Sequence, residues 1–267
     1  MNFPAVYEMI SNIKARLDAG RALLYQTARY VDIYKGLEDI ERTRKLTDEE
    51  KAELKLYQKL ASACTPLAKG MNSEYANLNA YDSIQVHGGS GYMLEYACQR
   101  LYRDARITSI YEGTTQLQTV AALPHINTGT YSQMLEELEA GEVAAEYESL
   151  KARTKAMDVK FNEAIEVVKA ANNNEFTDLC SRHLYAVSRK RLVLTSRVGE
   201  SETQAERSYK AANCVMTQLM LRDATKAPEL FDKSMKVYLN LAEAEVAKHY
   251  NFVKSVNVDA MESYRTA

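Results

Sequence analysis

The sequence is poor in the two residues that most often interrupt helices. Its 267 residues include only 4 prolines and 10 glycines, so long uninterrupted helices are possible, whereas a β fold with many turns is disfavoured. No apolar run approaches the roughly 18 residues that a membrane-spanning helix needs. The first residues, MNFPAVYEMISNIKARL, carry charges where the apolar core of a secretory signal would lie, which argues against a signal peptide.

Charge and cysteine usage exclude further classes of protein. A net charge of -2 argues against nucleic-acid binding, which needs a concentrated basic face. The four cysteines contain no CxxC pair and are most simply reduced, buried thiols of a reducing compartment: Cys64, Cys98, Cys180 and Cys214. We therefore expect a soluble protein of the cytoplasm or of an organellar matrix.

Familiar metal-binding and catalytic motifs are also missing. The segment Gly88–Tyr92 lacks the second glycine of a GxSxG nucleophile elbow, and GGSGYM does not match GxGxxG and follows a helix rather than a strand. There is no GKS or GKT. A thiol–imidazole pair of Cys98 with His87 is conceivable, but two unrelated residues are the simpler interpretation. The histidines show no metal-ligand spacing: His87, His125, His183 and His249.

Apolar residues at helical spacing predict two long helices joined by a short polar link at residues 42–47, and hence an antiparallel hairpin. The first helix is expected from about Pro4, which suits a first turn, to Arg44. Its predicted buried face comprises Val6, Ile10, Ile13, Leu17, Leu24, Ala28 and Val31. In the second helix Thr47 is the expected N-cap and forms a capping box with Glu50. The apolar stripe of that helix comprises Leu54, Tyr57, Leu60, Cys64, Leu67, Met71, Tyr75 and Leu78.

Charged residues gather at 38–53, around that link. A solvated helix end is the preferred interpretation of this cluster, with a partner surface as the alternative.

Beyond a glycine turn at Gly88–Gly91, we expect a third helix from about Tyr96 to Ser109 and a fourth that starts at Thr115. Thr115 and Gln118 have the spacing of a capping box. Glu112 and Gly113 fall in the connection between these helices.

The position of Glu112 raises the question of catalysis. The residue stands just before a helix N-terminus, whose free N–H groups can hold an oxyanion or a phosphate. Gly113 beside it would let another group approach the backbone closely. From residue chemistry alone, a loop carboxylate that faces water is the commoner explanation, and catalysis is the alternative.

The rest of the chain also carries helical patterns. Helices are predicted near residues 132–156, 159–171, 175–198, 201–225 and 228–258, with breaks at Asn172–Asn174, Gly199 and Ala227–Pro228. The last helix has a clear apolar face of Phe231, Met235, Tyr238, Ala242, Val246, His249, Val253 and Val256. No strand alternation of useful length is present, so the predicted fold is all-α.

Residues 85–118 resemble the C-terminal signature of the acyl-CoA dehydrogenases. Three motifs carry the resemblance at the family's separations: QVHGGSGY (Gln85–Tyr92), EYACQRLYRDARI (Glu95–Ile107) and IYEGTTQLQ (Ile110–Gln118). The sequence departs from the family at His87, where Phe is common, and at residues 97–99, where Ala-Cys-Gln replaces the usual Pro-Val-Glu.

The resemblance implies a division into two units. Residues 1–128 would form the family's C-terminal helical domain, incomplete at its N-terminus. Residues 129–267 would form a second helical bundle, similar to the extension of a longer bacterial subgroup. The family's N-terminal helical domain and central β domain would be missing from this chain.

The resemblance also implies an activity, the FAD-dependent α,β-dehydrogenation of an acyl-CoA thioester. Glu112 matches the catalytic base that removes the α-proton, and partial desolvation by the acyl chain makes a carboxylate a stronger base. Gly113 matches a substrate-contacting position. The remaining matched positions contact FAD: Thr114, Thr115 and Gln116 directly, and Gln85, Val86, His87, Gly88 and Gly89 at its adenosine-diphosphate part across a dimer interface.

We interpret the arginine-rich helix as structural: Arg100, Arg103 and Asp104 are expected to form ion pairs that brace the glycine turn. By resemblance we further expect a homodimer or homotetramer of the bacterial cytoplasm, with an acyl-CoA substrate and electron-transfer flavoprotein as acceptor, and no activity from this chain alone. Two alternatives stay open, namely a non-catalytic helical assembly module and an acyl-CoA oxidase.

Overall fold

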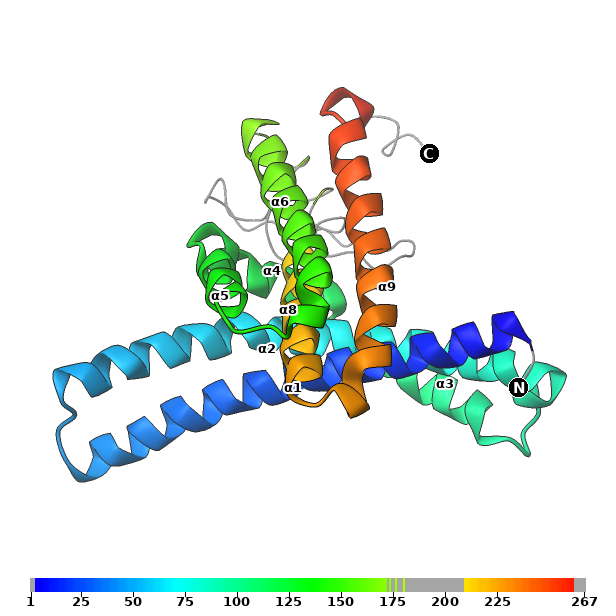
Figure 1. Ribbon diagram of the computed structural model, residues 1–267, viewed down its shortest axis with the longest axis horizontal. Helices are drawn as coiled ribbons and strands as arrows, with labels where there is room; N and C mark the ends of the chain where they lie inside the picture. The colour runs from blue at the N-terminus through cyan, green and yellow to red at the C-terminus, as the bar shows by residue number, and fades with distance from the viewer. Residues whose placement is uncertain (1–2, 172, 174–175, 177–179, 181–208, 262–267) are drawn as a thin grey trace.

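Two helices of equal length form the long hairpin that the sequence predicts (Figure 1). They are α1 (Pro4–Thr43) and α2 (Asp48–His87), each of 40 residues. The structure is a computed structural model and describes residues 3–171, 173, 176, 180 and 209–261. Within these residues every regular element is a helix, which confirms the all-α fold.

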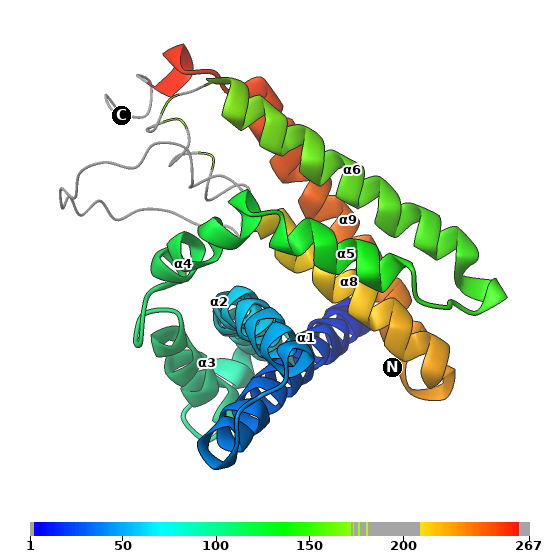
Figure 2. The same ribbon diagram turned by 90° about the vertical axis from the view of Figure 1, so that its left-hand side faces the viewer.

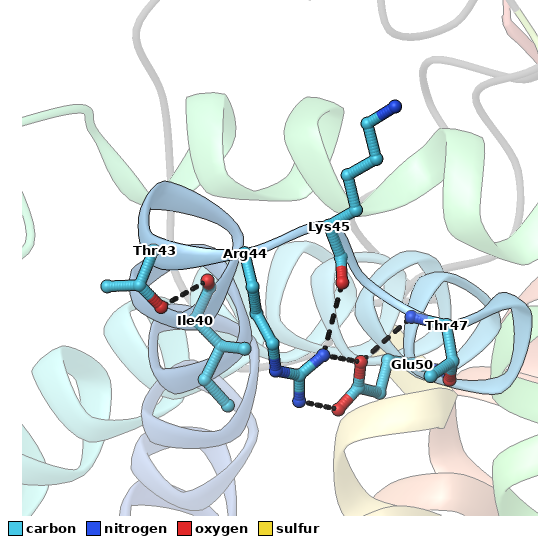
Figure 3. A network of polar contacts seen from close by, with 6 residues as sticks. All are labelled: Ile40, Thr43, Arg44, Lys45, Thr47 and Glu50. Atoms are coloured by element: carbon cyan, nitrogen blue, oxygen red, sulfur yellow. Dashed lines mark hydrogen bonds and ion pairs between the residues drawn. The ribbon is translucent and has the colours of Figure 1, made fainter.

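The link between α1 and α2 is closed by the predicted capping box (Figure 3). The Glu50 N–H donates to the Thr47 hydroxyl oxygen at 3.2 Å. The Thr47 N–H donates to the Glu50 carboxylate at 2.9 Å, the half of the box that Figure 3 draws. The Arg44 guanidinium donates to both oxygens of that carboxylate, at 2.7 and 2.6 Å. The bonds from Arg44 and then from the Thr47 N–H lower the pKa of Glu50 to about 2. These local ion pairs lie at an exposed turn, as expected if the charge cluster at 38–53 is a solvated helix end.

The predicted buried face of α1 is wrong in its middle. Leu17 and Leu24 are 42% and 49% exposed. The buried positions of this helix are Ala15, Asp18, Ala19, Gly20, Ala22, Leu23, Gln26, Thr27, Tyr30 and Leu37. Small side chains let α2, α8 and α9 pack closely on α1, and a face rich in alanine, glycine and polar residues carries little hydrophobic signal.

The predicted stripe of α2 is confirmed. Leu60, Cys64, Leu67, Met71 and Tyr75 are buried, and the outer members of the stripe are partly buried. After α2 come η1 (Gly88–Tyr92), α3 (Ala97–Thr108) and α4 (Thr115–Asn127), close to the expected bounds. Figure 2 shows α3 and α4 beside α2.

The glycine turn is not braced by ions. In the part of the chain that the structure describes, no ion pair joins Arg100, Arg103 or Asp104, so that interpretation is wrong. The Cys98 thiol instead donates to the Gly91 carbonyl oxygen at 3.2 Å. A Cβ atom at the buried Gly91 would lie only 2.6 Å from the Ile84 carbonyl oxygen. Close backbone packing therefore fixes the turn.

The C-terminal region adds α5 (Thr130–Glu139), η2 (Ala145–Tyr147), α6 (Glu148–Ala171), α8 (Tyr209–Lys226), α9 (Pro228–Ser255) and η3 (Asp259–Met261). The predicted helices 132–156 and 159–171 are wrong in their division, because the break falls between α5 and η2 and α6 runs without interruption. Gly141 follows α5, and the buried Tyr147 ties the new helix start to the core. The predicted helix 175–198 lies largely outside the described residues. The apolar face of α9 is confirmed.

One hydrophobic core connects the hairpin with the C-terminal helices. It contains residues of α1, α2, α4, α5, α6, α8 and α9, and Figures 1 and 2 show α6, α8 and α9 lying across the hairpin. The division at residues 128/129 stays a prediction, and this core spans it. No helix in the described ranges is long and apolar enough to span a membrane.

Candidate functional site

The corner between α3 and α4 is closed by short backbone bonds. The N–H groups of Ile110 and Tyr111 donate to the Ile107 carbonyl oxygen at 2.9 and 3.0 Å. The Thr115 N–H donates to the Ser109 carbonyl oxygen at 3.2 Å. This geometry forces the chain through a sharp turn at Glu112 and Gly113.

Glu112 and Gly113 both have left-handed backbone angles, with φ of 50° and 90°. Among the described residues, Glu112 is the only non-glycine residue with a positive φ, a conformation that costs about 1–2 kcal/mol for an L-residue. A Cβ atom at Gly113 would lie 2.6 Å from the Gln118 side-chain nitrogen. Strained backbone of this kind is common at functional sites, and here it coincides with the carboxylate that the sequence singled out.

The cap of α4 differs from the predicted one. The Thr114 hydroxyl, rather than that of Thr115, accepts the N–H of the third helical residue, Leu117, at 3.3 Å. Gln118 reaches back to the carbonyl oxygens of Glu112 and Gly113, at 3.3 and 3.4 Å. The predicted capping box of Thr115 with Gln118 is therefore wrong by one residue, although α4 begins at Thr115 as expected.

The hydroxyl of Thr115 has a different role. It donates to the Glu74 carboxylate on α2 at 2.6 Å. Thr115 thereby ties the first turn of α4 to the long hairpin.

Lys69 of α2 also reaches this corner, and the sequence analysis missed it. Its ammonium donates to the Gly113 carbonyl oxygen at 2.6 Å and lies 5.7 Å from the centre of the Tyr111 ring. Burial lowers the pKa of Lys69, opposed by the negative charges of Glu112 and Glu74. The available signal was a lysine placed between the buried residues Ala68 and Gly70.

The side chain of Glu112 is exposed. Glu112 precedes the N-terminus of α4, which is the positive end of the helix dipole, and its charge interacts with that of Lys69. Desolvation of this group would have to come from outside the described residues.

The glycine-turn residues lie elsewhere. Gln85 is eleven residues beyond Glu74 on α2, which is about 16 Å along the helix. The structure therefore separates two groups of predicted site residues. Glu112, Gly113, Thr114, Thr115 and Gln116 lie together at the corner. The other group lies at the C-terminal end of α2 and the start of η1: Gln85, Val86, His87, Gly88 and Gly89.

That far end can accept a large group. A Cβ atom at Gly88 or Gly89 would meet nothing within 4 Å, and both glycines are exposed, as are Gln85 and His87. This open backbone is separate from the Glu112 corner in this chain.

Other kinds of site are not supported. The described residues contain no group of three or more histidine, cysteine, aspartate or glutamate side chains placed to hold a metal ion. A cavity of about 230 Å³ lies among α1, α2, α5 and α8, lined by residues that include Tyr30, Leu60, Met134 and Arg222. None of its lining residues belongs to the corner.

Two family models together match nearly the whole sequence. The model described as acyl-CoA dehydrogenase, C-terminal domain, matches residues 1–122. A second model, described as acyl-CoA dehydrogenase C terminal, matches residues 127–205 and 199–261.

The three relatives described next have names that refer to a CoA thioester. The chain is 36% identical over 115 residues to 3-methylmercaptopropionyl-CoA dehydrogenase of Ruegeria pomeroyi, covering 43% of this chain and 18% of the relative. It is 32% identical over 117 residues to caffeyl-CoA reductase-Etf complex subunit CarC of Acetobacterium woodii, covering 44% and 24%. The identity to an acyl-CoA dehydrogenase of Bacillus subtilis is 42% over 64 residues, covering 24% and 17%. The matched regions thus span a quarter or less of these relatives.

Solved structures share the fold. An acyl-CoA dehydrogenase complexed with FAD from Bacillus anthracis has a TM-score of 0.63 at 18% identity, covering 94% of this chain and 42% of that one. Caenorhabditis elegans ACDH-11 in complex with C11-CoA has a TM-score of 0.62 at 18% identity, covering 89% and 35%. These likenesses support the arrangement of helices rather than a shared substrate.

Proposed function

This chain belongs to the acyl-CoA dehydrogenase family, and from that premise we propose that it is the C-terminal helical part of an FAD-dependent acyl-CoA dehydrogenase. The proposal rests on one observation, the strained corner that holds a glutamate and a glycine in left-handed conformations just before α4. Strained backbone of this kind clusters at active sites and ligand-binding loops, which supports the corner as the active site. The matching motif and the names of the relatives supply the chemistry.

In the proposed reaction Glu112 is the catalytic base. Its carboxylate takes the proton from the α-carbon of the acyl-CoA thioester. The Glu112 backbone N–H donates to the thioester carbonyl oxygen and stabilises the negative charge that develops there. Gly113 leaves space for the substrate beside the base. Bound FAD supplies the hydride acceptor for the hydrogen that leaves the β-carbon.

The proposed cofactor contacts come from two separate segments, one beside the middle of α2 and one at its C-terminal end. Thr114, Thr115 and Gln116 lie near the base and would hold one FAD. Gln85, Val86, His87, Gly88 and Gly89 would hold the adenosine-diphosphate part of a second FAD across a dimer interface, since the two segments are separate in one chain.

The proposed partners follow from the same reading. We infer a homodimer or homotetramer in the bacterial cytoplasm that passes electrons to an electron-transfer flavoprotein. The name of the CarC relative, a subunit of a reductase-Etf complex, supports that acceptor. The chain alone would be inactive, because it holds only part of the proposed flavin site.

The test uses the complete protein that contains this chain. Purified protein is expected to carry FAD whose absorbance bleaches when acyl-CoA thioesters are added. Glu112→Gln should keep the flavin and abolish bleaching, while Glu95→Gln, at another exposed glutamate, should bleach normally. Retained bleaching in Glu112→Gln would remove Glu112 from the role of base. Protein without flavin would favour an assembly module, and rapid oxygen consumption without a protein acceptor would favour an oxidase.

A further inference from the structure

Two contacts and one electrostatic interaction of Lys69 converge on three consecutive residues of the corner. The ammonium donates to the Gly113 carbonyl oxygen at 2.6 Å, lies 5.7 Å from the Tyr111 ring centre, and interacts electrostatically with the intervening Glu112. Lys69 stands on α2, far from the corner in sequence. A partly buried lysine that reaches three successive residues is not explained as a solvated surface charge.

The Lys69 contacts also leave the carboxylate free. Among the residues that the structure describes, Lys69 forms no ion pair within 4.0 Å, because its ammonium is directed to a carbonyl oxygen instead. A direct ion pair would occupy the oxygens of Glu112. The observed arrangement holds the backbone at Gly113 and places a positive charge nearby without blocking the carboxylate.

We propose that Lys69 is a positioning residue for the Glu112 base: its ammonium fixes the Gly113 carbonyl, and thereby the direction of Glu112, and it places a positive charge near the carboxylate. This inference rests on the proposed function of Glu112. A fixed bond at Gly113 preserves the left-handed corner against relaxation. A nearby cation favours the charged form of a carboxylate.

The groups that face Lys69 are few, which makes the pH dependence interpretable. Glu74 lies on the same helix and is bonded to Thr115. Glu112 and Tyr111 face it from the corner. Removal of the lysine charge should therefore act on Glu112 more than on any other group that the reaction uses.

The experiment measures the rate of flavin bleaching by an acyl-CoA thioester as a function of pH, in the complete flavoprotein. Lys69→Met is expected to slow bleaching at neutral pH roughly 10- to 100-fold, as misplacement of a catalytic group does. The pH dependence of the rate should change as the nearby cation is lost. Lys69→Arg should restore the pH profile and most of the rate. Lys55→Met, at an exposed lysine of the same helix, should match the unmodified enzyme.

The outcomes separate this inference from the proposed function. If Glu112→Gln still bleaches, the proposed function fails. If Glu112→Gln is inactive while Lys69→Met has a normal rate and pH profile, only the inference about Lys69 fails. Should Lys69→Met not retain flavin, Lys69→Gln and Lys69→Arg replace it. A rate and profile that are equal in those two variants would show that the charge has no role and would overturn the inference.

Discussion

The hydroxyl groups of Tyr75 and Tyr238 lie 2.9 Å apart in the core, within hydrogen-bond distance of each other and of the side-chain oxygen of Asn213, at 3.3 and 3.1 Å. The three residues belong to α2, α9 and α8, so this buried network joins the hairpin to the C-terminal helices. Burial raises the pKa of Tyr75 to about 12 and that of Tyr238 well above its ordinary value. Both phenols therefore stay neutral, and the C-terminal helices are part of the same core as the corner.

Removal of one hydroxyl tests this network. Tyr238→Phe leaves Tyr75 and Asn213 buried with one partner fewer, and we expect it to lower the free energy of unfolding by about 1–2 kcal/mol. The measurement is urea denaturation of the purified chain followed by circular dichroism. Tyr25→Phe is the matched control, because Tyr25 is 67% exposed and should change stability by less than about 0.5 kcal/mol. Equal values for the two variants would contradict a structural role of the network.

Two glycines of α1 should respond in opposite directions to the same substitution. A Cβ atom at Gly36 meets nothing within 4 Å, so Gly36→Ala should stabilise the chain by about 0.5–1 kcal/mol through helix propensity. At the buried Gly20 the Cβ atom would lie 2.1 Å from the Asn72 side-chain oxygen, and the bond from Asn72 to the Gly20 carbonyl would be lost. We expect Gly20→Ala to destabilise by about 1 kcal/mol despite the same propensity gain. Thermal unfolding of both variants checks the prediction, and a stabilised Gly20→Ala would show that Asn72 moves away freely.

Asp158 on α6 should make stability depend on pH. Burial, helped by the nearby Glu139, raises the pKa of Asp158 from 3.8 to about 7. The folded protein therefore keeps a proton that the unfolded chain has released, so its contribution to stability is greatest below about pH 4 and declines as pH rises to about 7.

Asp158→Asn mimics the protonated carboxyl and removes this dependence. We expect the variant to be more stable than the unmodified chain at pH 8 by roughly 1–3 kcal/mol and to differ little from it at pH 4. Denaturation across this range supplies the test, with Asp48→Asn as the control at an exposed carboxyl. A parallel pH dependence in Asp158→Asn and the unmodified chain would refute the assignment.

Much of the fold could be predicted from the sequence because its signals are local. The capping box at Thr47 and Glu50 and the dense apolar stripes of α2 and α9 predicted those two helices correctly. The face of α1 could not be predicted, because what buries it is alanine and glycine packed by helices that come later in the chain. The division of α5 from α6 was missed for a related reason, since it depends on Tyr147 reaching a core assembled from distant segments.

The candidate site shows the same limit. The motif pointed to Glu112 and Gly113, and both lie at a strained corner. Lys69 could not be identified from the sequence, because its importance comes from a hydrogen bond to Gly113, which is 44 positions away in the sequence. The start of α4 at Thr115 was predicted correctly, but its capping residue was assigned one position late, since no propensity rule anticipates two consecutive left-handed residues.

The strain at Glu112 can itself be measured. At φ 50° an L-residue pays a steric cost that glycine does not. Glu112→Gly and Glu112→Ala both remove the carboxylate, so any difference between them reports the backbone. Glycine normally destabilises a protein relative to alanine through the entropy of the unfolded chain, yet here we expect Glu112→Gly to be the more stable variant by about 1 kcal/mol. Chemical denaturation of the two variants side by side decides the sign. If Glu112→Ala were the more stable, the corner would relax without its glutamate, and strain could no longer be counted among the reasons to place the active site there.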